Sequence, residues 1–65
     1  MQVELNGRPV ETAAQTLAAL VAEQGFDATV VATALDGVFV PRGDRVATPI
    51  AAGARVEVLS PMQGG

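Results

Sequence analysis

The sequence predicts an α+β domain in which one helix covers one face of a mixed sheet of four to five strands. Two turn-forming pairs, Asn6-Gly7 and Asp36-Gly37, each separate two short strand-like segments, as in tight β-hairpins. Residues 17–21 carry apolar side chains at helical spacing, and no other stretch does so as clearly. A final alternating segment, Arg55–Ser60, adds one more strand.

The first hairpin begins with the alternating segment Met1–Leu5. Asn6-Gly7 favours a type I′ turn, and a two-residue loop then pairs Val3 with Val10. Both valines face the same side of the sheet in this register, so the pairing is self-consistent. The returning segment, Arg8–Thr12, contains a proline that cannot donate to a ladder, and we therefore expect an edge strand.

The helix has two candidate starting points. Thr12 with Gln15 three residues later fits a capping box, whereas Thr16 would cap a shorter helix. We favour Thr16. At the other end, Gly25 is placed to stop the helix in the left-handed conformation, with Phe26 folding back on the last turn. The apolar stripe of this helix consists of Leu17, Leu20 and Val21.

The second half of the chain supplies the remaining strands. Thr29–Leu35 is almost continuously apolar and β-branched, which predicts a strand buried on both faces. Val38–Val40 follows the second turn pair, and Arg42–Ala47 is expected to form one turn of 3₁₀ helix. With the first strand and Arg55–Ser60 parallel at the sheet centre, this order of elements is the ubiquitin-like β-grasp fold.

Composition excludes several classes of function. The 65 residues form one domain at most, and they include no cysteine or histidine for a disulfide or a zinc site. Seven acidic residues against four arginines give a net charge of −3, so we expect no nucleic-acid partner. The acidic residues are scattered and suggest neither a metal site nor acid–base catalysis. No segment resembles a signal peptide or a membrane span, so we expect a cytoplasmic protein that does not bind membranes.

The chain ends in Gly64-Gly65 directly after the last predicted strand. We expect a folded domain over residues 1–60 and a flexible C-terminal segment over residues 61–65. Glycines lack a Cβ atom, so a di-glycine can pass through a narrow channel and present its carboxylate to the active site of another protein. The alternative is an ordinary frayed terminus.

Two parts of the sequence resemble a known family. Val40-Pro41-Arg42 after the middle hairpin and the terminal Gly64-Gly65, together with the β-grasp order, are similar to the sulfur carrier proteins of thiamine biosynthesis. The resemblance covers essentially the whole chain. The chain departs from the family pattern at Gln63, where many members have glycine, and at Ala54, where many have aspartate.

The resemblance implies a function for the terminus. The Gly65 carboxylate would be adenylated by a ubiquitin-activating-like enzyme that consumes ATP, and then converted to a thiocarboxylate. A sulfur-donating protein such as a cysteine desulfurase would supply the sulfur, and a thiazole synthase would accept it. The chain would be a co-substrate without a stably bound cofactor, and not an enzyme.

We expect the partner-binding residues to lie at the C-terminal end. Gly64 and Gln63 would enter the channel of the partner. Leu59 is predicted to point away from the inward-facing Val56 and Val58, and with Met62 it would form a docking surface beside the reactive carboxylate. Packing of Leu59 in the core is the alternative.

Other functions share this fold and terminus. The small subunit of molybdopterin synthase has the same thiocarboxylate chemistry. A ubiquitin-like modifier that is conjugated to lysines, or a carrier for cysteine synthesis, is a second alternative. A β-grasp interaction module with an incidental di-glycine is a third.

Overall fold

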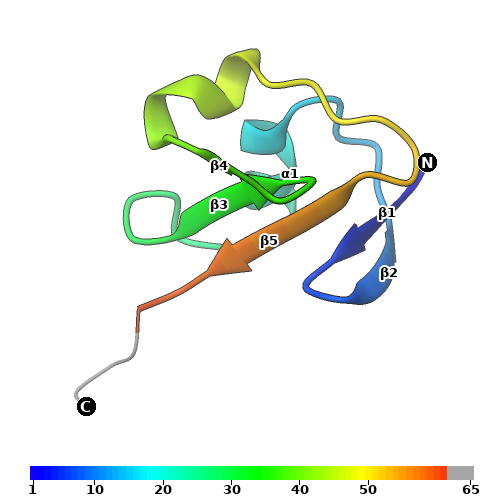
Figure 1. The fold of residues 1–65 in the computed structure, drawn as a ribbon, viewed down its shortest axis with the longest axis horizontal. Helices are drawn as coiled ribbons and strands as arrows, with labels where there is room; N and C mark the ends of the chain where they lie inside the picture. Colours follow the sequence, from blue (N-terminus) through cyan, green and yellow to red (C-terminus); the bar gives the residue numbers. More distant parts are fainter. Residues whose placement is uncertain (62–65) are drawn as a thin grey trace.

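The computed structural model describes residues 1–61. Its elements are β1 (Gln2–Leu5), β2 (Arg8–Glu11), α1 (Leu17–Glu23), β3 (Ala32–Leu35), β4 (Val38–Val40), the 3₁₀ helix η1 (Arg42–Ala47) and β5 (Arg55–Leu59). The strands form one five-stranded sheet in the order β2-β1-β5-β3-β4, with α1 packed on one face (Figure 1). Strands β1 and β5 run parallel, and the other pairs are antiparallel. The predicted β-grasp architecture is confirmed.

Both hairpins form at the predicted turn pairs. Asn6 and Asp36 have φ values of 51° and 50°, in the left-handed region that short polar side chains tolerate best among non-glycine residues. In the first hairpin Val3 pairs with Val10, as predicted from the two-residue loop. The tight turns fix the register of both outer strand pairs.

Helix α1 begins after Thr16, whose side-chain oxygen accepts a hydrogen bond of 3.1 Å from the N–H of Ala19. It ends in a Schellman motif, in which Gly25 has a φ of 79° and the N–H of Phe26 donates to the carbonyl of Val21 at 3.2 Å. Both predicted caps are confirmed.

Thr12 does not cap the helix. It instead connects the segment between β2 and α1 to the C-terminal end of α1. Its Oγ1 accepts from the N–H of Ala14 at 2.9 Å and donates to Oε2 of Glu23. The N–H of Ala13 donates to the other carboxylate oxygen of Glu23 at 3.3 Å. The hydrogen bond from Thr12 is the main cause that lowers the pKa of Glu23 below its ordinary value. Glu23 therefore has a structural role that its exposed position does not suggest.

The strand predicted from Thr29 begins instead at Ala32, and it is not buried on both faces. Asp27 Oδ1 accepts hydrogen bonds from the N–H of Thr29 at 2.9 Å and from its hydroxyl at 2.6 Å, which holds this stretch in a turn. Val30 is 50% exposed. Within the strand, Thr33 is buried and Ala32 is exposed, because α1 covers one face of the sheet only.

The core lies between α1 and the covered face of the sheet. Its most deeply buried side chains are Val3, Leu17, Leu20, Val21, Thr33 and Val56. Across residues 1–61, no helix is both long and apolar enough to cross a membrane.

Arg45 of η1 is also buried, at 4% exposure, although a charged residue in a polar segment is usually exposed. Its guanidinium donates to Thr33 Oγ1 at 2.9 Å and to the carbonyls of Ala28 at 2.9 Å and Val31 at 2.7 Å. These bonds fasten η1 and the loop before β3 to the sheet, and they replace the carboxylate that usually accompanies a buried arginine.

Candidate functional site

Strand β5 carries the chain toward its C-terminal segment, and its side chains alternate strictly. Val56 and Val58 point into the core at 1% and 3% exposure. Leu59, the last residue of the strand, is 64% exposed on the opposite, open face. The structure therefore excludes the alternative that Leu59 packs in the core.

Leu59 belongs to an apolar patch at the end of β5. Phe39 of β4 is 65% exposed on the same face. Strand β3 lies between them, because Ala34 pairs with Phe39 and Ala32 pairs with Leu59. We call these four residues the open-face patch. They surround a shallow, mostly apolar hollow with Glu57 and Thr33 at its margin.

Phe39 was not among the residues predicted to bind a partner. The signal was present in the second hairpin, where the turn pair and the inward-facing Val40 together require Phe39 to face the open side. Reading this register together with that of Leu59 would have identified both large side chains of the open-face patch.

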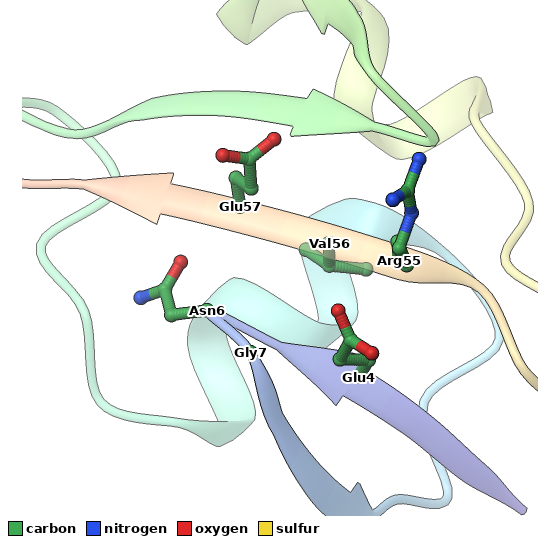
Figure 2. Close-up of a pocket in the computed structure, with 6 residues that line it drawn as sticks. All are labelled: Glu4, Asn6, Gly7, Arg55, Val56 and Glu57. Atoms are coloured by element: carbon green, nitrogen blue, oxygen red, sulfur yellow. The ribbon is translucent and has the colours of Figure 1, made fainter.

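A larger hollow of about 240 Å³ lies on the same face of the sheet between β1 and β5 (Figure 2). Its lining residues are Glu4, Asn6, Gly7, Arg55, Val56 and Glu57. Figure 2 shows the carboxylate and guanidinium groups standing clear of the sheet, with helix α1 behind it. Within residues 1–61, no three potential ligand side chains are grouped to hold a metal ion. Charged and polar side chains make up most of the lining of this larger hollow, whereas the open-face patch is mostly apolar and includes Leu59, the last residue of β5.

Asn6 contacts β5 in a way that its turn position alone does not require. Its Oδ1 accepts from the N–H of Val58 at 2.9 Å, and its Nδ2 donates to the carbonyl of the same residue at 3.1 Å. Figure 2 shows the Asn6 amide directed toward β5. The sequence predicted the turn at Asn6 but not this contact, which joins residues 52 positions apart.

The family motif Val40-Pro41-Arg42 has a structural position at the junction of β4 and η1. Val40 is buried at the end of β4, and Pro41 precedes the 3₁₀ helix with a φ of −60°. The carbonyl of Pro41 accepts from the N–H of Asp44 at 2.9 Å, which begins η1. The motif thus turns the chain away from the open-face patch.

Ser60 and Pro61 follow β5 and are exposed, and they lead away from the sheet (Figure 1). The other predicted site residues, Met62, Gln63, Gly64 and Gly65, lie outside the described part of the chain. Their roles, and the boundary between a domain over residues 1–60 and a segment over 61–65, remain predictions.

The family model described as the ThiS family matches residues 3–65. The chain belongs to the ThiS family. The match includes both the β-grasp domain and the C-terminal di-glycine. No curated protein matches the chain.

Solved structures support the ThiS assignment. A crystal structure of the thiamine biosynthesis protein ThiS from Geobacter metallireducens is 30% identical, with a TM-score of 0.80 and all of both chains covered. A solution NMR structure of a thiamine biosynthesis protein from the same organism is 30% identical, with a TM-score of 0.83. That match covers all of this chain and 88% of the other.

Proposed function

We propose that this ThiS-family chain is a sulfur carrier for thiazole formation in thiamine biosynthesis, with the Gly65 carboxylate as the group that carries the sulfur. The observation that carries the proposal is the family match, which runs to residue 65 and thus includes the di-glycine. The ThiS structure from Geobacter metallireducens, described as a thiamine biosynthesis protein, supports the pathway.

The chemistry begins with a carboxylate, which is a poor electrophile because it is negatively charged and has no good leaving group. A carboxylate oxygen of Gly65 attacks the α-phosphorus of ATP, and pyrophosphate leaves. Sulfur at the oxidation level of hydrosulfide then adds to the carbonyl carbon of the acyl-adenylate. The bond to AMP breaks, a proton is released, and the product is a thiocarboxylate. Its ionised sulfur is the nucleophile for the next reaction.

The chain supplies the reacting carboxylate but not the catalytic groups. It has no histidine or cysteine. Hydrogen bonds to Thr12 and Thr29 lower the pKa values of Glu23 and Asp27, respectively, which makes these carboxylates weaker bases. An adenylating enzyme that consumes ATP therefore provides the activation. A protein such as a cysteine desulfurase provides the sulfur as a persulfide, and a thiol reductant brings it to the hydrosulfide level while being oxidised to a disulfide. A thiazole synthase is the acceptor, and the chain itself is a co-substrate that retains no cofactor.

We assign docking on the adenylating enzyme to the open-face patch. Two large apolar side chains, Phe39 and Leu59, are each about two-thirds exposed there, at 65% and 64%. Burial of such a pair in a partner pocket is a strong source of binding energy, and Glu57 at the margin can add a polar rim. Six residues follow Leu59, and fully extended they reach about 20 Å at most. A partner seated on the patch therefore needs an active site within about 20 Å of Leu59 for Gly65 to reach it.

The proposal is tested by ATP–pyrophosphate exchange with the cognate adenylating enzyme. We expect exchange that depends on the carrier and disappears when Gly65 is deleted. A pull-down from the source organism should recover a thiazole synthase. Recovery of a molybdopterin synthase large subunit instead, or no carrier-dependent exchange, would contradict the proposed function.

A further inference from the structure

Strand β5 loses its backbone partner on one side before it ends. The ladder to β1 includes a hydrogen bond of 2.9 Å from the N–H of Asn6 to the carbonyl of Val56. Beyond this point β1 has turned into the hairpin, so the N–H and carbonyl of Val58 face a side with no strand. The Asn6 side chain satisfies both groups, at 2.9 and 3.1 Å. A single amide side chain thus extends the sheet by one pair.

We propose that Asn6 is a positioning residue for the sulfur-carrying terminus, which it aligns by holding Val58 at the end of β5. This inference rests on the proposed function. Leu59 lies directly after Val58, and within residues 1–61 its one strand partner is Ala32 on the other side of β5. The Asn6 contact therefore fixes the last residues before the chain leaves the sheet, together with one edge of the open-face patch.

The Asn6 contact orders the end of β5 before the enzyme binds. Without the amide, the β1 side of Val58 is open to water, and the end of β5 is paired only with β3. Leu59, Ser60 and Pro61 then sample more directions in the free carrier. Ordering them costs free energy when the enzyme binds, so the cost appears in KM rather than in the chemical step.

Asparagine meets two requirements at this position. It tolerates the φ of 51° that the hairpin needs, and it offers one acceptor and one donor side by side. Glycine would satisfy the turn but remove both contacts. Aspartate would keep the acceptor for the N–H of Val58 but place a second oxygen against the Val58 carbonyl.

The chain contains a matched control in its other hairpin. Asp36 has a φ of 50°, and its Oδ1 accepts from the N–H of Arg55 at 2.9 Å. Asp36→Gly therefore also removes a hydrogen bond between a hairpin side chain and β5. This bond lies at the start of β5, at the opposite end of the strand from Leu59. Both variants keep a residue that suits the turn.

The experiment measures KM and kcat of carrier-dependent ATP–pyrophosphate exchange, well below the melting temperature of every variant. We expect Asn6→Gly to raise KM about tenfold, because two hydrogen bonds are lost, and to leave kcat within about twofold of the wild-type value. Asn6→Asp should give a smaller increase, and Asp36→Gly should change KM less than about twofold. Amide hydrogen exchange at Val58 should accelerate in Asn6→Gly and remain unchanged in Asp36→Gly.

Two results would overturn the positioning role. One is an unchanged KM in the folded Asn6→Gly variant. The other is an equal rise in KM for Asn6→Gly and Asp36→Gly, which would indicate a general effect of stability. Absence of exchange with the wild-type carrier would instead overturn the proposed function itself, so the two failures are distinguishable.

Discussion

Arg45 donates from Nε to the hydroxyl of Thr33 at 2.9 Å, and that hydroxyl donates in turn to the carbonyl of Val40 at 2.9 Å. The other guanidinium contacts are to the carbonyls of Ala28 and Val31. All these acceptors are uncharged, and together they join η1, the loop before β3, and the β3–β4 hairpin. The buried arginine thus holds these three segments together, and one of them, the β3–β4 hairpin, carries Phe39.

Replacing Arg45 should destabilise the domain. Arg45→Met leaves three acceptors without their donor, and we expect a loss of about 2–4 kcal/mol in the free energy of unfolding, measured by urea titration. Arg45→Lys should also destabilise the domain, because one ammonium group cannot direct donors at the three acceptors as the planar guanidinium does. The control is Arg42→Met in the exposed first position of η1, with an expected change within about 0.5 kcal/mol. Equal stability of the Arg45 and Arg42 variants would contradict this role.

Glu23 should make stability depend on pH. Its pKa is lowered in the folded state, chiefly by the hydrogen bond from Thr12, so its contribution is present above the ordinary value of 4.5. That contribution is lost as pH falls from 4.5 through the lower folded value. Glu23→Gln should therefore cost stability at neutral pH, and the difference from wild type should shrink in acid. In a Thr12→Val background the cost should be smaller, and an unchanged cost would rule out this coupling.

Leu59→Glu should weaken binding to the adenylating enzyme and leave the fold intact. The change removes apolar burial and introduces a charge into the docking surface. We therefore expect the binding free energy, measured by calorimetry, to be less favourable by about 1–3 kcal/mol. The melting temperature should be almost unchanged, since Leu59 is 64% exposed. Val46→Glu is the control, because Val46 is 70% exposed on η1 and outside the open-face patch. Equal affinity of the two variants would disprove the docking assignment.

Gly64→Val should block sulfur transfer without affecting stability. The substitution adds a β-branched side chain where passage through a narrow channel needs none. We expect thiocarboxylate formation to fall by at least about tenfold, with the melting temperature unchanged. A parallel loss of both would mean that Gly64 belongs to the folded body.

The sequence predicted those features that depend on neighbouring residues. The two turn pairs, the Thr16 cap and the Gly25 stop each involve residues within five positions, so their pattern is visible in the chain itself. The α+β layout followed from the hydrophobic alternation of the segments and the single helix available to cover them. Leu59 could be placed on the open face for the same reason, since strand side chains alternate with a period of two.

The features that the sequence did not predict depend on a competing local structure or on contacts between residues far apart in the chain. Asp27 captures Thr29 in a turn, which overrides the strand propensity of the β-branched residues that follow. Arg45 is buried because carbonyls 14 and 17 positions away converge on it, and a charged residue in a polar segment gives no such indication. The contact between Asn6 and Val58 likewise depends on the parallel pairing of β1 with β5, which brings the first and the last strand side by side.

The central claim is tested most directly by the intact mass of the carrier after incubation with its adenylating enzyme, ATP and sulfide. We expect an increase in mass that corresponds to exchange of one oxygen for one sulfur, located by fragmentation at Gly65. A variant without Gly65 should unfold at the same temperature and gain no sulfur. Sulfur incorporation in that variant, or its location at any other residue, would contradict the assignment of Gly65 as the sulfur-carrying group.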